Sequence, residues 1–169
     1  MNLNVVIEIS KGSNVKYEYD FKTKKLFVDR ILSTPVTYFF NYGFIENTIG
    51  GDGDAIDALV LCEESLFPTC YIQCRPVGVL YTEDEHGDDA KVLLVPVSCV
   101  NPVYDNINEL SDINEETKKK LVFFFENYKK MEKNKWTKVG NFDDKTAAEK
   151  IIKDGQSKYN LVKPQLTEN

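Results

Sequence analysis

The chain has 169 residues, 42% of them apolar, which is enough for one compact domain with a substantial core. Its formal net charge of −6 argues against a general nucleic-acid-binding protein, because such proteins neutralise phosphates with a basic surface. No stretch approaches the apolar length of a membrane span, and the N-terminus lacks the basic start of a secretion signal. We therefore expect a soluble, unprocessed single domain, residues 1–169.

The four cysteines show no C-x-x-C pair. On one strand, Cys70 and Cys74 would lie roughly 13 Å apart, which is too far for a disulfide. We interpret the cysteines as small apolar residues in a reducing cytoplasm rather than as zinc ligands.

The N-terminal segments 3–9 and 15–20 alternate apolar and polar residues, which predicts two strands joined by a hairpin turn. Lys16 and Glu18 should share one face, because strand side chains repeat every two residues. A third strand is predicted over 25–32. It carries Arg30 and precedes an aromatic tract that runs from Tyr38 to Phe44.

An acidic loop, residues 50–57, then places three aspartates and three glycines directly before the apolar run 58–61. Carboxylates this close repel one another unless a cation lies among them, which predicts a site for hard divalent ions. A calcium EF-hand loop starting at Asp52 is excluded, because Ile56 would be its fifth ligand and Asp57 would replace its required glycine. A solvated turn remains the simpler alternative.

Two further strands are predicted over 70–81 and 91–97, and they are separated by a second acidic cluster at 83–89. Asp89 and Lys91 should lie on the same face of the strand that leaves this turn. A charged hairpin tip is ordinarily only solvated, so this cluster alone does not indicate a site. It supports a metal site only together with the acidic loop at 50–57.

The C-terminal half is predicted to be helical. Asn114 is a plausible N-cap for a helix that buries Leu121, Phe124, Phe125 and Tyr128. A second helix should begin at Asp143 or Asp144, bury Ala148, Ile151 and Ile152, and end near Gly155, with a fraying tail over 160–169. Short strands followed by two helices indicate an α+β fold, a small β-barrel with helices against it.

These pieces carry a resemblance to a known family. The relevant segments are Leu26–Arg30, Asn41–Phe44, Asp52–Asp57, Cys74–Leu80, Asp84–Lys91, Phe124–Lys129 and Lys133–Trp136. In one register from about Val5 to Trp136, they resemble the soluble family I inorganic pyrophosphatases. The resemblance implies a five-stranded OB-like β-barrel flanked by two helices, and hydrolysis of pyrophosphate to two orthophosphates. It also implies dependence on several Mg²⁺ ions, with Mn²⁺ or other divalent ions as substitutes.

The resemblance also implies roles for individual residues. Asp54 matches the general base that takes a proton from a metal-activated water, and Tyr42 matches the phenol that hydrogen-bonds to it. The metal-binding positions are Asp52, Asp57, Asp84, Asp89 and Glu18. The substrate-binding positions are Lys16, Arg30, Tyr38, Lys91, Tyr128 and Lys129. The supporting acidic positions are Glu8 and Glu85.

The sequence departs from the family pattern at four positions. Ala55 and Phe39 replace prolines, which loosens the backbone near the site. Bacterial members carry subunit-contact histidines where this chain has Phe123 and Asn127. A homo-oligomer is expected, a hexamer by resemblance, with a trimer or smaller assembly left open.

Two other functions remain as alternatives. The aromatic residues from Tyr38 to Phe44 would suit an OB-type barrel that stacks single-stranded nucleic acid, although the acidic charge opposes this. The second alternative is a protein that binds metal and phosphate but has lost enzymatic activity. We expect pyrophosphate as substrate, with neither nucleic acid nor membrane as partner.

Overall fold

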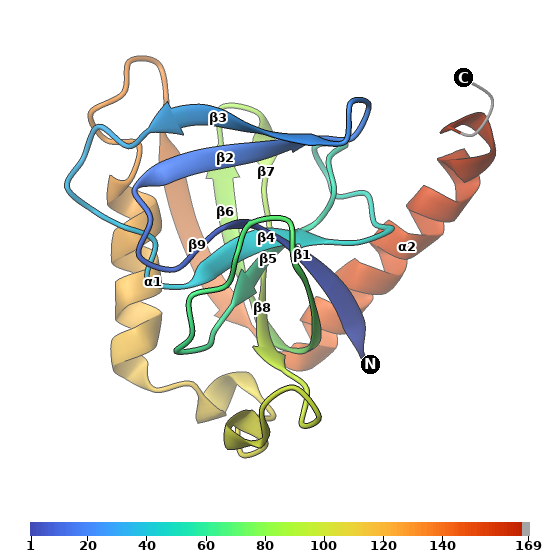
Figure 1. Cartoon of the computed structure of the whole chain (residues 1–169). Coiled ribbons are helices and arrows are strands. Elements are labelled where there is room, and N and C mark those ends of the chain that lie inside the picture. The colour runs from blue at the N-terminus through green and yellow to red at the C-terminus, as the bar shows by residue number, and fades with distance from the viewer. Residues whose placement is uncertain (167–169) are drawn as a thin grey trace.

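The computed structural model describes residues 1–166 and combines one large sheet, a β-hairpin and two long helices (Figure 1). The strands are β1 (Leu3–Ile9), β2 (Val15–Asp20), β3 (Lys25–Ile31), β4 (Asn41–Ile45), β5 (Asp57–Val60), β6 (Tyr71–Asp84), β7 (Gly87–Asp88), β8 (Lys91–Pro96) and β9 (Thr137–Asp143). The helices are α1 (Glu115–Asn127) and α2 (Lys145–Leu166), preceded by 3₁₀ turns at Pro102–Tyr104 and Leu110–Asp112. The predicted α+β class is confirmed. No helix within residues 1–166 combines the length and apolar character needed to cross a bilayer.

The large sheet has seven strands in the order β1-β4-β5-β8-β6-β7, with β9 paired to β6. Strand β1 also pairs with β6, so the path β1-β4-β5-β8-β6 returns to its first strand. The β5–β8 pair is parallel and the other neighbours are antiparallel. The predicted count of five strands is not confirmed, because β7 and β9 extend the sheet along β6. The β2–β3 hairpin is a separate sheet that lies across the top of Figure 1. The predicted hairpin between 3–9 and 15–20 is wrong, because β2 pairs with β3 whereas β1 pairs with β4 and β6.

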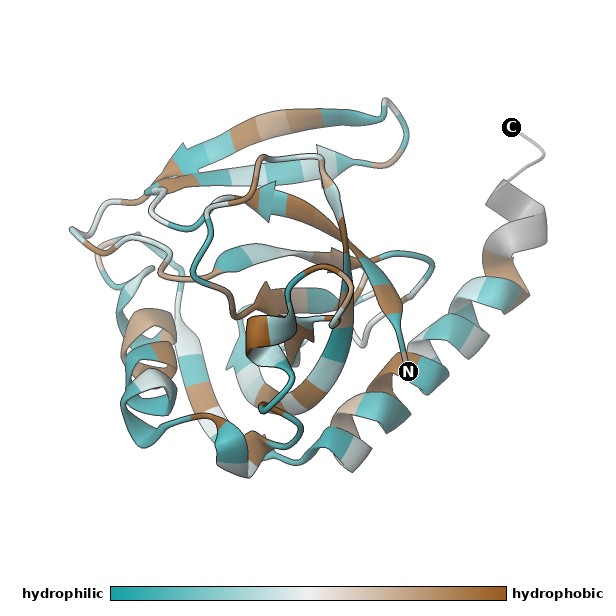
Figure 2. Cartoon of the chain, turned by 60° about the horizontal axis from the view of Figure 1, so that its bottom comes forward, coloured by the Kyte–Doolittle hydropathy of each residue, from teal (hydrophilic) through white to brown (hydrophobic). Residues whose placement is uncertain are grey.

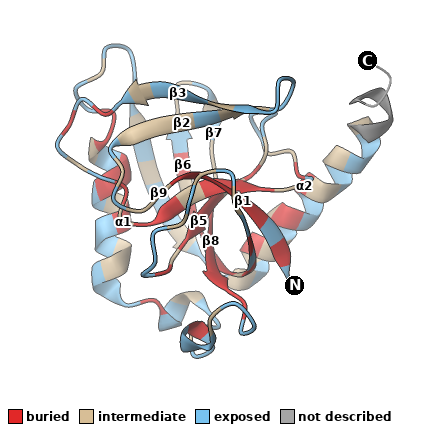
Figure 3. Cartoon of the chain, in the orientation of Figure 1, coloured by how far each residue is buried: buried red, intermediate tan, exposed pale blue. Residues whose placement is uncertain are grey.

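The central strands are buried throughout rather than on one face, as Figure 3 shows in red. Every residue of β8 is buried, and so are Ala58, Leu59 and Val60 of β5. Continuous apolar runs are what a parallel pair with both faces covered requires. In contrast, β2 and β3 are only half-buried or exposed, so the hairpin forms a rim above the packed sheet.

Helix α1 begins as predicted, because the Asn114 side chain accepts a hydrogen bond from the Thr117 N–H at 2.7 Å. The helix packs its apolar stripe against the aromatic tract, with ring centroids 4.8 Å apart for Tyr38 and Phe124. Tyr38 and Phe40 are 2% and 0% exposed. These two rings therefore form core and are not available to stack nucleobases, which weakens the nucleic-acid alternative.

Helix α2 begins after Asp144, whose side chain accepts a hydrogen bond from the Ala147 N–H at 2.9 Å. The predicted end near Gly155 is wrong, because α2 continues to Leu166 and includes most of the tail that was expected to fray. Residues 167–169 of that tail lie outside the described residues. Figure 2 shows hydrophobic and hydrophilic residues interspersed along α2, as in other amphipathic helices.

Gly155 serves close packing rather than helix termination. It is buried where α2 meets the loop that precedes the aspartates, and its carbonyl accepts a hydrogen bond from the Ile49 N–H at 3.1 Å. A Cβ atom at position 155 would collide with the Ile56 side chain and lie 3.0 Å from the Ile49 carbonyl oxygen. Only glycine allows this approach without displacement.

Replacing Gly155 with valine should lower the free energy of unfolding by about 1–3 kcal/mol, because overpacking must push α2 away from Ile56. Thermal unfolding checks this result. Ser157→Val places the same side chain on the exposed side of α2, so it controls for the lower helix propensity of valine. Equal losses in both variants would contradict the packing role.

Candidate functional site

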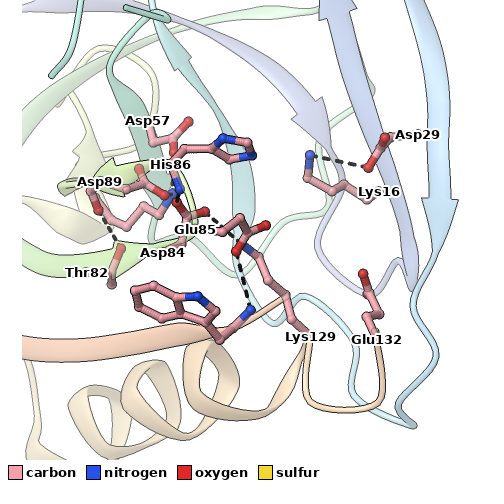
Figure 4. A network of polar contacts seen from close by, with 12 residues as sticks. Lys16, Asp29, Asp57, Thr82, Asp84, Glu85, His86, Asp89, Lys129 and Glu132 are labelled. Atoms are coloured by element: carbon pink, nitrogen blue, oxygen red, sulfur yellow. Dashed lines mark hydrogen bonds and ion pairs between the residues drawn. The ribbon is translucent and has the colours of Figure 1, made fainter. Parts of the chain in front are cut away.

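A polar hollow of about 310 Å³ opens between the β2–β3 hairpin and the large sheet. It gathers side chains from both acidic clusters, from the hairpin and from the segment after α1; Figure 4 shows part of it. Every predicted site residue except Tyr38 lines it: Glu8, Lys16, Glu18, Arg30, Tyr42, Asp52, Asp54, Asp57, Asp84, Glu85, Asp89, Lys91, Tyr128 and Lys129. A larger hollow of about 900 Å³, beside the start of α1, contains none of these residues.

Hydrogen bonds from backbone N–H groups hold the first acidic loop, residues 50–57, in a turn. The Gly50 N–H donates to the Asp54 carbonyl at 2.6 Å, and the Asp54 N–H donates to Asp52 Oδ1 at 3.1 Å. Gly53 has φ +97°, a conformation that favours glycine. The turn leaves the Asp54 side chain exposed at the hollow, and Asp57 becomes the first residue of β5. Partial burial and the neighbouring Asp52 raise the pKa of Asp54 above its ordinary value.

The second acidic cluster lies at the β6–β7 turn. Asp84 caps the turn by accepting the His86 N–H at 2.8 Å. Asp89 is held by its backbone, because its N–H donates to the Thr82 carbonyl at 2.8 Å and its carbonyl accepts the Thr82 hydroxyl. His86 is exposed in the turn, as predicted, and it also lines the hollow.

The two acidic clusters meet at Lys91, the first residue of β8. Its ammonium donates to Asp89 at 2.5 Å, to the Asp57 carboxylate and to the Tyr42 hydroxyl at 3.2 Å. The Lys91 side chain is only 3% exposed. Burial opposes its charge, but the two carboxylates outweigh that effect and raise the pKa of Lys91. This ion triplet confirms the predicted proximity of Asp89 and Lys91.

The two carboxylates that share the Lys91 ammonium differ in pKa. Burial raises the pKa of Asp89 to about 6. Burial also opposes ionisation of Asp57, yet Lys91 and its hydrogen bond outweigh it and lower the pKa of Asp57. Burial raises the pKa of Tyr42 well above its ordinary value, with Asp57 adding to the effect, so this phenol is neutral near pH 7.

Three of the predicted metal-binding residues line the hollow without forming a preassembled site. Asp52, Asp57 and Asp89 all line the hollow, but within residues 1–166 no three Asp, Glu, His or Cys side chains are grouped closely enough to hold one metal ion. The reason is that Lys91 lies between Asp57 and Asp89, while Asp52 faces its own loop. The donors nevertheless fit Mg²⁺, because they are hard carboxylate oxygens and two of them already share one cation.

Three further cations, Lys16, Arg30 and Lys129, form a basic clamp in which each is paired with a carboxylate. Lys16 lies 3.5 Å from Glu18, which confirms their predicted common face. Lys129 lies 2.7 Å from Asp84 and 3.4 Å from Glu85. Such pairing keeps the cations fixed without neutralising the hollow completely.

Tyr38 does not reach the hollow. It is packed in the aromatic core, with its ring centroid 5.8 Å from that of Tyr42. Tyr38 thus contacts Tyr42, which lines the hollow, and its role in substrate binding stays a prediction. Tyr128 lines the hollow and is 6% exposed, with its ring stacked on Phe124.

Three neighbours of the site had no predicted role. Asp29 contacts both Arg30 and Lys16, and Lys135 lines the hollow; both belong to segments that carried the resemblance. Glu132 pairs with Arg30 at 2.8 Å from a position 102 residues later in the chain. No local pattern in the sequence could have joined those two residues.

Glu8 is a buried carboxylate beside the hollow, and its Oε1 accepts the Tyr19 N–H at 2.8 Å. Burial, opposed by this hydrogen bond, raises the pKa of Glu8 from 4.5 to about 7. The folded protein therefore binds this proton up to about pH 7, whereas the unfolded chain releases it near pH 4.5. Stability falls as the pH rises through this window.

Glu8→Gln should therefore gain stability relative to the parent chain between pH 5 and 8, by at most about 3 kcal/mol at pH 8, because glutamine cannot ionise. Thermal unfolding in the presence of a chelator measures the difference at each pH. Glu126→Gln, on the exposed face of α1, controls for the loss of one charge. An equal shift at pH 5 and pH 8 would contradict the assignment.

Comparisons with known proteins agree with one another. The family model for inorganic pyrophosphatase matches residues 5–160. An inorganic pyrophosphatase of Nanoarchaeum equitans is 50% identical, covering 94% of this chain and 98% of that protein, and one of Rickettsia prowazekii is 47% identical over 90% of each.

Solved structures give the same result. An inorganic phosphatase of Anaplasma phagocytophilum superposes with TM-score 0.92 at 46% identity, over 94% of both chains. An inorganic pyrophosphatase of Helicobacter pylori superposes with TM-score 0.92 at 42% identity, again over 94% of both. The chain belongs to the inorganic pyrophosphatase family, whose members are enzymes that hydrolyse pyrophosphate.

Proposed function

We propose that this chain hydrolyses inorganic pyrophosphate to two orthophosphates in the polar hollow, with divalent metal ions held by its aspartates. One observation carries the proposal: two acidic clusters and a basic clamp, distant in sequence, line a single hollow and meet at Lys91. Anionic substrate and cationic metal would both find partners there.

Asp52, Asp57 and Asp89 are proposed to hold the tightest ion, and Asp84, Asp89 and Glu18 the ions that arrive with substrate. Mg²⁺ is the expected metal and Mn²⁺ a substitute, because all donors are hard oxygens. When bound, such ions would lower the pKa of a coordinated water and shield the charge of pyrophosphate. Asp57 and Asp89 must release the Lys91 ammonium to do so.

Asp54 is proposed as the general base. Its exposed carboxylate faces the hollow, and its raised pKa makes it a stronger proton acceptor than an ordinary aspartate. Tyr42, neutral and hydrogen-bonded to Lys91, is proposed to hydrogen-bond to Asp54. Glu8 and Glu85 support the arrangement through the Tyr19 N–H and Lys129.

The basic clamp is proposed to bind phosphate oxygens. Arg30 can offer a fork of parallel N–H groups, whereas Lys16, Lys129 and a released Lys91 act as point charges. Tyr128 lines the same hollow and can add a hydroxyl donor. The clamp compensates the charge that develops on the leaving phosphate.

We also propose a barrel type, a cellular compartment and an oligomeric state for this chain. The closed path β1-β4-β5-β8-β6 with its parallel β5–β8 pair supports a five-stranded barrel of the OB type within a single domain. All four cysteines are free thiols, which fits a reducing cytoplasm. Phe123, 59% exposed on α1, fits a homo-oligomer, whose size sedimentation would measure.

Phosphate release from pyrophosphate tests the proposal. Activity should rise from background to a plateau as Mg²⁺ is titrated into chelator-treated protein, because water ionisation near neutral pH requires the metal. Magnesium-independent release would contradict the metal requirement. Tight metal and phosphate binding without release would identify a binding protein instead.

A further inference from the structure

Glu132 holds the Arg30 guanidinium in a mostly buried ion pair. Arg30 Nε lies 3.0 Å from Glu132 Oε1 and 2.8 Å from Oε2, and the two side chains are 18% and 9% exposed. Arg30 comes from β3 and lines the hollow, whereas Glu132 comes from the segment after α1 and is not among the lining residues. The pair thus joins two separate walls of the site.

The other two nitrogens of the Arg30 guanidinium, NH1 and NH2, differ in their hydrogen bonding. Its NH1 group donates to Asp29, and its NH2 group is buried without a hydrogen-bond partner within residues 1–166. Buried N–H groups of this kind normally meet an acceptor. Because Glu132 occupies Nε and Asp29 accepts from NH1, the NH2 group and the second N–H of NH1 are the donors of Arg30 that remain for phosphate oxygens.

We propose that Glu132 is a positioning residue for pyrophosphate: by holding Nε, it keeps the NH1–NH2 edge of Arg30 directed at the phosphate. This inference rests on the proposed function. A long arginine side chain otherwise loses its rotamer freedom only when substrate binds, which weakens binding. The competing explanation is that the pair only fastens the hairpin to the segment after α1.

A double-mutant cycle separates the two explanations, with kcat and KM for magnesium pyrophosphate and thermal unfolding as readouts. Glu132→Ala should lower kcat/KM roughly tenfold, mainly by raising KM, because Arg30 is still present but less well oriented. Glu132→Gln keeps an oxygen acceptor for Nε, so its kcat/KM should fall clearly less than that of Glu132→Ala. If the alanine variant folds poorly, the glutamine variant provides the test instead. Glu116→Ala, which breaks an exposed ion pair with Lys120 on α1, should stay within about twofold of the parent chain.

The decisive comparison uses the Arg30→Ala background. There, Glu132→Ala should change kcat/KM by less than about twofold, because its only route to substrate has been removed. A full tenfold loss in that background, or no loss with Arg30 present, would overturn the proposal while leaving the proposed function intact. An Arg30→Ala variant with unchanged KM would overturn both this inference and the clamp role of Arg30. A parent chain without pyrophosphatase activity would instead refute the proposed function itself.

Discussion

Asp54→Asn is expected to lower the turnover of pyrophosphate by roughly 10² or more while leaving the fold intact. The Asp54 side chain is exposed, and none of the hydrogen bonds found within residues 1–166 involves its carboxylate. Only its backbone groups hold the loop, and asparagine retains them. Thermal stability should therefore stay within about 0.5 kcal/mol of the parent chain.

Steady-state phosphate release and thermal unfolding should be measured on the same preparations of Asp54→Asn. Asp88→Asn is the matched control, because Asp88 is an exposed aspartate of the neighbouring turn that does not line the hollow. It should keep activity within about twofold. Retention of most activity by Asp54→Asn would exclude this residue as the base, and so would a loss that merely follows unfolding.

Among the proposed variants, Lys91→Met is expected to lower the free energy of unfolding the most when no metal is present. Lys91 is the cation that Asp57 and Asp89 share, and its removal leaves two carboxylates facing each other without a counter-charge. Breaking a buried pair in this way costs about 3–5 kcal/mol. For a chain of this length, the melting temperature should fall by roughly 10 °C in chelator.

Added Mg²⁺ should then stabilise Lys91→Met more than it stabilises the parent chain, because no ammonium competes for the carboxylate oxygens. Calorimetry or a thermal shift with and without Mg²⁺ measures this difference. Lys11→Met removes a surface ammonium that pairs with the exposed Glu63, and it should show neither the large loss nor the metal rescue. Equal stabilisation of Lys91→Met and the parent chain would show that ammonium and metal do not share these oxygens.

Local patterns predicted much of the fold. Alternation located strands β1 and β2 but paired them wrongly, since β2 forms its hairpin with β3. A side-chain acceptor located the start of α1 at Asn114. Strand β9 was missed, because Thr137–Asp143 contains Gly140 and charged residues and gains its order from pairing with the edge of β6. Gly155 misled the helix prediction, since its small size is needed for packing and nothing in its sequence neighbourhood shows that.

The composition of the site was easier to predict than its arrangement. Strand parity correctly placed Asp89 near Lys91, and family resemblance assembled the other candidates. The position of the Lys91 ammonium between Asp57 and Asp89 depends on β4, β5 and β8 meeting in one sheet, which no local pattern encodes. The Arg30–Glu132 pair depends in the same way on tertiary packing.

The contact between α2 and the loop before β5 has a consequence for synthesis of the protein. Ile49 donates its N–H to Gly155, and the same loop leads directly into Asp52, Asp54 and Asp57. A nascent chain emerging from the ribosome can pair its early strands before residue 155 has been made, but it cannot brace the aspartate loop. The loop beside the hollow thus gains this contact only after residue 155 has been made, and chains cut short before α2 would carry the aspartates without it.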